Sequence, residues 1–183
     1  AAGVPFVAFG RPWEATGATH AWVDIDGAAG TSAATRALLE AGRGPVGWIG
    51  WPDTSGVGAD RRAGWLDAVG PDAPHLEEAR EDGIAEGREA MAALLDRGVR
   101  SVVCASDSLA VGAVLAWHDR HGEDATPELS PVVGFDDTPL ARFRSFSSVA
   151  QPVEDAARAC IKLLLAQLEG SGATPDGEQV LLA

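Results

Sequence analysis

The sequence predicts an α/β protein in which parallel strands are covered by helices on both faces. Two observations support this fold class. Short, continuously apolar segments such as PVGWIG (45–50), SVVCA (101–105) and PVVGF (131–135) have the composition of strands buried on both sides. Longer segments with helical spacing or capping residues separate them, and strands that alternate with helices form parallel sheets.

The expected elements follow from local signals. Strands are predicted at 4–9, 22–25, 45–50, near 75–77, and at 101–105, 131–135 and 180–182. Helices are predicted from a cap at Asp26 to residue 41, and at 61–69, 84–97, 107–121 and 153–168. The clearest helix is 153–168, whose apolar residues recur at i, i+3, i+4 and i+7. A glycine-rich loop is expected at 52–58.

Composition and charge narrow the class of protein. The 183 residues carry a formal net charge of −13, which repels nucleic acid phosphates, so this segment alone is a poor DNA binder. No stretch approaches the roughly 20 apolar residues of a membrane span, and residues 1–10 lack the pattern of a secretory signal. The two cysteines, Cys104 and Cys160, fall in predicted strand and helix interiors. Buried thiols are typical of a reducing compartment, so we expect a cytoplasmic protein without a membrane partner.

Polar residues just after the predicted strands are the candidates for binding, because ligands of such sheets lie beyond the carboxyl ends of the strands. These candidates are Asp26, the loop 51–61, Ser106 with Asp107, and Asp136 with Asp137. No Ser-His-Asp or Cys-His spacing is present, and the loop 47–58 lacks the glycine order of nucleotide-binding motifs. His118 and His121 lie one helical turn apart without a third metal ligand nearby. The sequence therefore predicts a binding protein, not an enzyme, with no cofactor and no metal.

Five segments together resemble the effector-binding core of the LacI/GalR regulators, over nearly the whole chain. They are VDIDGAAG (23–30), RRAGWLDAV (61–69), ASDSLAVGAVLAW (105–117), VVGFDDTPLARF (132–143) and SSVAQPVEDAARACIKLLL (147–165). The resemblance implies a periplasmic-binding-protein-like type I fold with two parallel-sheet lobes across a cleft. Residues 43–150 would form the C-terminal lobe, and residues 1–42 and 151–183 part of an incomplete N-terminal lobe. The chain would cross between lobes near 41–45 and 150–153.

The resemblance also implies roles for single residues. Arg61 matches the arginine of an R-x-x-G-[FWY] motif that reaches the ligand; the alternative is a surface arginine at a helix start. Asp136 matches a ligand-contacting aspartate, the alternative being a turn or cap, whereas Asp137 and Asp107 are expected to be helix caps. Asp26 is either a hydroxyl-binding acid or an N-cap.

Three further candidates carry alternatives of their own. Ser106 stands where some sugar-binding relatives have Asn, and Trp51 could stack on a sugar or pack in the core. Asp82 stands where relatives often place an aromatic residue, which transfers the stacking role to Trp13 or Trp22.

The implied function is the ligand-binding and dimerisation core of a LacI-type transcriptional regulator. It would sense a sugar or similar small polar effector in the cleft between the lobes. Operator DNA would be bound through a helix-turn-helix domain outside this chain, and the regulator would be a homodimer. The alternative is a periplasmic sugar-binding receptor of a transporter, which shares the fold but needs secretion.

Overall fold

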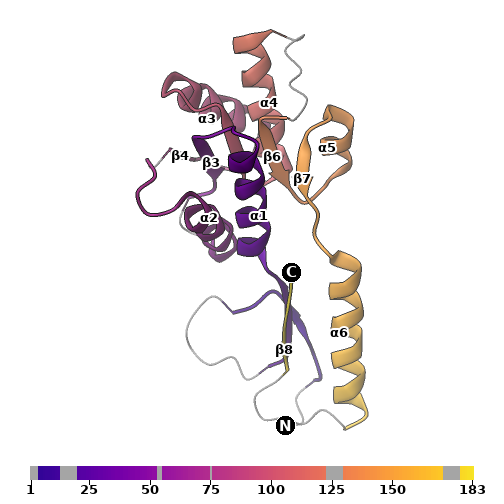
Figure 1. The fold of residues 1–183 in the computed structure, drawn as a ribbon. Coiled ribbons are helices and arrows are strands. Elements are labelled where there is room, and N and C mark those ends of the chain that lie inside the picture. Colours follow the sequence, from indigo (N-terminus) through magenta and orange to yellow (C-terminus); the bar gives the residue numbers. More distant parts are fainter. Residues whose placement is uncertain (1–3, 13–19, 53–54, 75, 123–129, 171–177) are drawn as a thin grey trace. The chain divides into compact units, whose positions relative to one another are not determined.

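The computed structural model describes residues 4–12, 20–52, 55–74, 76–122, 130–170 and 178–183. Their contacts divide the chain into two compact units (Figure 1). The larger unit is the continuous segment Gly27–Gln151, and the smaller one combines Ala1–Asp26 with Pro152–Ala183. The boundary expected at residue 42 differs from this division, because the helix that follows Asp26 packs within the larger unit. The assignment of the units to the two lobes of the family fold stays a prediction.

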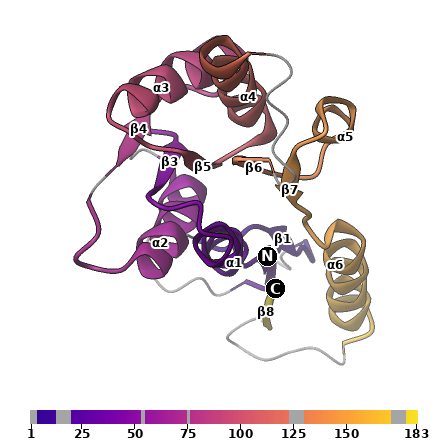
Figure 2. The ribbon, with the colours of Figure 1, turned by 45° about the horizontal axis from the view of Figure 1, so that its top comes forward.

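The larger unit is built on a five-stranded, all-parallel sheet in the order β4-β3-β5-β6-β7. The strands are β3 (Val46–Gly50), β4 (Glu77–Ala79), β5 (Ser101–Cys104), β6 (Val132–Phe135) and β7 (Ser147–Val149). Its helices are α1 (Gly27–Glu40), α2 (Gly56–Val69), α3 (Ile84–Asp96), α4 (Asp107–His121) and the short α5 (Pro139–Arg144). Figure 2 shows α1 and α2 on one face of the sheet and α3 and α4 on the other. The predicted fold class is therefore confirmed.

Every residue of β3, β5 and β6 is buried, as their continuous apolar runs predicted. On the α1–α2 side, Trp65 is fully buried and stacks on Trp48 of β3 with ring centroids 6.3 Å apart. The indole N–H of Trp65 donates a 3.1 Å hydrogen bond to the carbonyl of Val46. A large aromatic group with its polar atom satisfied thus ties α2 to the start of β3.

Glycines allow both helix pairs to approach closely. A Cβ atom at Gly64 of α2 would overlap the carbonyl oxygen of Ala28 in α1, and one at Gly112 of α4 would overlap the carbonyl of Ile84 in α3. Beside Gly64, the hydroxyl of Thr31 donates a 2.6 Å hydrogen bond to the carbonyl of Arg61. The position of Arg61 therefore depends on the spacing between α1 and α2.

Replacing Gly64 with alanine is expected to destabilise the larger unit by about 1–3 kcal/mol, because the new methyl group meets a backbone atom. Intrinsic helix propensity alone would favour alanine by about 1 kcal/mol. Urea unfolding followed by circular dichroism checks the sign. Ala63→Gly, at the exposed neighbouring position, calibrates the propensity contribution. A stabilised Gly64→Ala protein would contradict the close approach.

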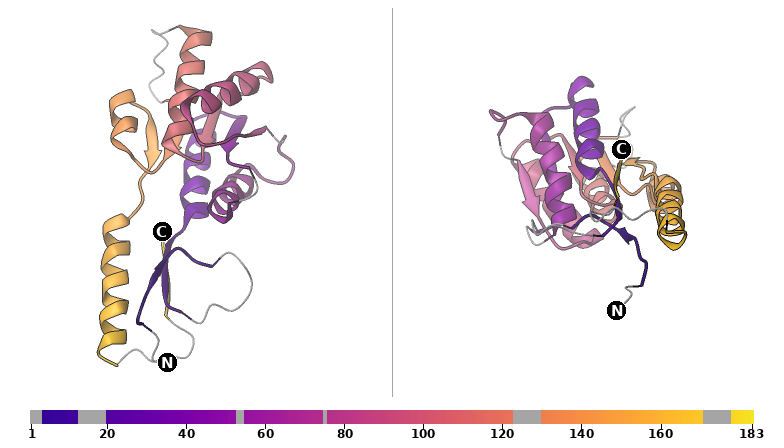
Figure 3. Two further views of the ribbon diagram at one scale, coloured as in Figure 1. Left: turned by 180° about the vertical axis from the view of Figure 1, so that it is seen from behind. Right: turned by 90° about the horizontal axis from the view of Figure 1, so that it is seen from below.

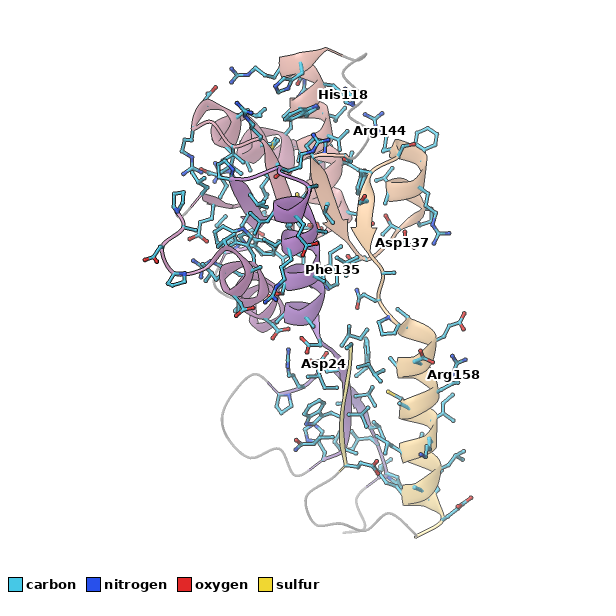
Figure 4. All side chains as sticks on the ribbon, viewed as in Figure 1. Asp24, His118, Phe135, Asp137, Arg144 and Arg158 are labelled. Carbon is cyan, nitrogen blue, oxygen red and sulfur yellow. The ribbon has the colours of Figure 1, made fainter. Side chains whose placement is uncertain are left out.

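The smaller unit has a three-stranded parallel sheet in the order β1-β2-β8. Its strands are β1 (Ala8–Phe9), β2 (Trp22–Ile25) and β8 (Gln179–Leu182), and α6 (Val153–Leu168) runs beside them (Figure 3). Val23, Ala156 and Leu163 form its core. Figure 4 places Asp24 on β2, where its carboxylate pairs with Arg11 at 3.0 Å.

Several local predictions were wrong. Strand β1 covers only two residues of the expected 4–9, and β4 begins at Glu77, at the end of the expected segment. The expected loop at 52–58 is partly helical, because Ser55 caps α2 by accepting a hydrogen bond from Gly58 N–H at 3.2 Å, so the helix begins at Gly56. Helix α5 and strand β7 were not predicted. None of the helices in the described residues is long and apolar enough to cross a membrane.

Candidate functional site

The sheet order of the larger unit creates a crevice at the carboxyl ends of β3 and β5. The chain leaves β3 toward α2 on one face and β5 toward α4 on the other, so the two connections diverge. This is the switch point at which open α/β sheets bind ligands. Trp51 follows β3, Ser106 follows β5, Asp136 follows β6 and Asp82 lies three residues beyond β4.

A pocket of about 600 Å³ opens at this crevice, a size in the usual range for small-molecule sites. All of its lining residues belong to the larger unit: Trp51, Asp82, Ser106, Asp107, Ser108, Asp136, Thr138, Pro139, Leu140 and Phe143. Four of the six residues expected from the sequence are among them, and a fifth, Arg61, contacts two of these four. The sixth, Asp26, belongs to the smaller unit.

Arg61 lies on the buried stripe of α2, in line with Gly58 and Trp65 at helical spacing. Its side chain is only 8% exposed. Nη1 donates to the carbonyl of Ala105 at 2.6 Å, and Nη2 lies 3.3 Å from Oδ1 of Asp136. The guanidinium carbon stands 3.7 Å from the ring centroid of Phe135. Nε has no hydrogen-bond partner among the described residues. The alternative of a surface arginine at the helix start is therefore wrong.

Burial lowers the pKa of Arg61, and the nearby carboxylates of Asp136, Asp60 and Asp82 oppose that shift by stabilising the protonated guanidinium. Arginine stays charged in proteins, so this group is a buried cation held by acidic neighbours and an aromatic face. Such a cation holds the carboxylate of Asp136 at the edge of the pocket.

Asp136 is held in an unusual backbone conformation. It and Asp137 both have positive φ, 102° and 45°, which side-chain-bearing residues rarely adopt. The N–H of Asp136 donates to the carbonyl of Val149 at 2.9 Å, and Oδ1 also accepts a hydrogen bond from the Gln151 amide. Strain of this kind gathers where a side chain must be aimed at a particular point. Figure 4 shows Phe135 and Asp137 at the end of β6.

Asp82 joins Trp51 and Ser106. Its Oδ1 accepts a 3.1 Å hydrogen bond from the indole N–H of Trp51 and a short one from the hydroxyl of Ser106. The Trp51 ring centroid is 5.4 Å from the Arg61 guanidinium carbon. The five residues of the larger unit are thus connected in one chain of contacts, from Ser106 through Asp82, Trp51 and Arg61 to Asp136.

Two capping predictions were wrong. Helix α4 is capped by Ser106, whose hydroxyl accepts from Leu109 N–H at 3.2 Å, and Asp107 is the first helical residue. Asp107 is buried and accepts from the N–H and hydroxyl of Thr138 at 2.7 and 2.8 Å and from the Ser148 hydroxyl at 2.6 Å. The N-cap of α5 is Thr138, not Asp137, and Asp137 pairs with Arg142 at 2.6 Å. That exposed pair lowers the pKa of Asp137.

Sequence reasoning missed the apolar wall of the pocket. Pro139, Leu140 and Phe143 belong to α5, and Phe143 is 81% exposed. The signal was Pro139, a residue that favours the first helical position. Of the aromatic residues suggested as a sugar platform, Trp13 lies outside the described residues and Trp22 belongs to the smaller unit. No cluster of three metal-binding side chains occurs in the part of the chain that the structure describes.

Comparison with known proteins identifies the family of the chain. A family model described as a periplasmic binding protein-like domain matches residues 35–182. The regulator CelR of Thermobifida fusca is 31% identical over 95% of this chain and 53% of its own length. The regulator GalS of Salmonella typhimurium is 30% identical over 87% of this chain and 48% of its own length. The chain thus spans about half the length of these curated relatives.

Solved structures of LacI-family regulators have a similar fold. A LacI-family regulatory protein from Chloroflexus aggregans aligns with a TM-score of 0.83 and 36% identity, covering 97% of this chain and 65% of that one. The complex of CelR with cellobiose aligns with a TM-score of 0.81 and 30% identity, covering 98% and 56%. The fold and the family model define an α/β protein of the periplasmic binding protein-like class. The chain belongs to the LacI/GalR family of transcriptional regulators and corresponds to its effector-binding core.

Proposed function

We propose that the pocket of the larger unit binds a sugar or similar small polar effector and that the protein regulates transcription in response. The observation that carries this proposal is the pair of the buried Arg61 and the half-buried Asp136, which fixes the Asp136 carboxylate at the pocket edge before a ligand arrives. The relatives named above are transcriptional regulators, and one was solved with cellobiose. These names do not favour the transporter receptor or an enzyme.

The remaining partners belong to the whole regulator. Operator DNA would be bound by a helix-turn-helix domain of the kind that the relatives' names denote, in a cytoplasmic homodimer whose symmetry matches paired half-sites. The effector would act by preferring one conformation of the regulator over another. Asp26 is proposed as a further polar contact to the effector.

A thermal-shift screen against sugars, polyols, sugar phosphates and nucleobases tests the effector class. A ligand present at 100 times its dissociation constant stabilises the folded protein by about 2.7 kcal/mol. We expect a shift with at least one sugar or polyol. The proposal of a small polar effector fails if no compound of any of these classes raises the unfolding temperature.

Arg61→Ala and Asp136→Ala are each expected to weaken binding of the effector so identified by about 2–4 kcal/mol, the scale of a buried charge-assisted contact. Calorimetric titration measures the loss, and circular dichroism verifies the fold. Matched controls are Arg62→Ala, whose side chain pairs with Glu77, and Asp137→Ala, whose side chain pairs with Arg142. Unchanged affinity in both site variants would place the effector elsewhere.

A further inference from the structure

Carboxylates dominate the charged groups of the pocket. Three of its lining residues are aspartates, Asp82, Asp107 and Asp136, and none of the lining residues that the structure describes is basic. The nearest cation is Arg61, which already contacts Asp136 and the carbonyl of Ala105. Three carboxylates face one guanidinium, so the pocket has an excess of negative charge.

The free polar atoms of the pocket are mainly acceptors. In both Asp82 and Asp136 every side-chain hydrogen bond is made by Oδ1, which leaves Oδ2 without a hydrogen-bond partner among the described residues. An ionised carboxylate only accepts hydrogen bonds, so these atoms need a ligand that donates. A hydroxyl donates, whereas a phosphate dianion or a carboxylate does not.

Arg61 itself does not line the pocket: its side chain is more than nine-tenths buried, and its Nε is buried without a hydrogen-bond partner among the described residues. The bidentate donor pair with which arginine usually binds a phosphate or carboxylate is therefore not presented to the pocket, and each terminal nitrogen already donates one hydrogen bond within the protein, to Ala105 or to Asp136. Trp51, Leu140 and Phe143 supply an apolar surface for the carbon side of such a ligand.

From these contacts we infer that the effector is a polyhydroxyl compound without negative charge, and that phosphorylated or carboxylated sugars are excluded. This inference rests on the proposed effector pocket and names the chemical class that the pocket selects. Exclusion follows because an anion would meet unpaired carboxylates in a partly desolvated site, where like charges repel strongly.

Calorimetric titration with matched pairs tests the inference: glucose with gluconate and glucuronate, galactose with galacturonate, cellobiose with cellobionate, and each sugar with its phosphate ester. We expect at least one neutral sugar to bind and its anionic counterparts to bind at least about 100-fold more weakly. An anionic sugar that binds as tightly as its neutral parent overturns the inference and leaves the proposed function intact. If neither neutral nor anionic members bind and the thermal-shift screen also finds no ligand, the proposed function fails as well.

A charge variant separates local repulsion from the general negative charge of the protein. Asp82→Asn removes one pocket carboxylate and keeps an acceptor for Trp51 and Ser106, so the affinity ratio of anionic to neutral sugar should rise at least about threefold. Asp119→Asn removes the same charge from an exposed pair with Arg88 and should leave that ratio unchanged. Equal affinity ratios in the Asp82→Asn and unaltered proteins would show that the charge of Asp82 does not exclude anionic sugars.

Discussion

Replacing Asp107 with alanine is expected to lower the free energy of unfolding of the larger unit by about 3 kcal/mol or more. The buried carboxylate accepts three hydrogen bonds, two from Thr138 and one from Ser148. These bonds fasten the start of α4 to the segment that follows β6 and to β7. Their loss leaves half-buried donors without acceptors and loosens the turn that carries Asp136.

Urea unfolding of Asp107→Ala and of Asp107→Asn measures the effect. Asparagine preserves the shape of the side chain with a single acceptor oxygen, so the free energy of unfolding of Asp107→Asn should lie between those of the unaltered protein and of Asp107→Ala. Asp119→Ala on the same helix is the control, because its pair with Arg88 is half-exposed and contributes less than about 1 kcal/mol. Equal losses at the two aspartates would contradict the anchoring role of Asp107.

Trp65→Ala is expected to destabilise the larger unit by about 3–5 kcal/mol, the usual cost of removing a fully buried aromatic side chain. The cavity would open between α2 and β3, where the ring stacks on Trp48. Because Trp65 follows Arg61 by one helical turn, effector affinity should fall together with stability.

Two further variants separate the contributions at this position. Trp65→Phe retains most of the apolar contact but loses the hydrogen bond to Val46, so a loss of about 1–2 kcal/mol is expected. Phe143→Ala removes a mostly exposed ring of α5 and should change the unfolding midpoint little. An unfolding midpoint for Trp65→Ala close to that of Phe143→Ala would show that the α2 packing described here is wrong.

The fold was predictable where burial is two-sided or helical periodicity is long. Strands β3, β5 and β6 have continuous apolar runs because helices cover both sheet faces, and such runs are visible in sequence. Strand β7 lies at a sheet edge and contains only Ser147, Ser148 and Val149, so it lacks this signal. The first turn of α2 was missed because Gly56 and Gly58 are typical of a loop. The Ser55 cap and tertiary packing stabilise a helix there instead.

The positions of the candidate site residues along the chain were predictable, but the contacts between their side chains were not. Trp51, Ser106 and Asp136 follow strands, and the carboxyl ends of parallel strands meet at one edge. Nothing in the sequence indicates that Asp82 bridges Trp51 and Ser106 or that Gln151 reaches Asp136, since these contacts span many residues. The apolar wall of α5 was hidden because six helical residues are too few for a periodic pattern.

The division of the chain has a consequence for the order in which the protein folds on the ribosome. The larger unit is one uninterrupted segment, so its sheet can close as soon as residue 151 has left the exit tunnel. The smaller unit pairs Trp22 with Gln179, and this pairing waits until residue 179 has been made. Such distant contacts form slowly. A nascent chain should therefore hold the finished pocket of the larger unit while β2 still lacks the neighbour that completes its sheet.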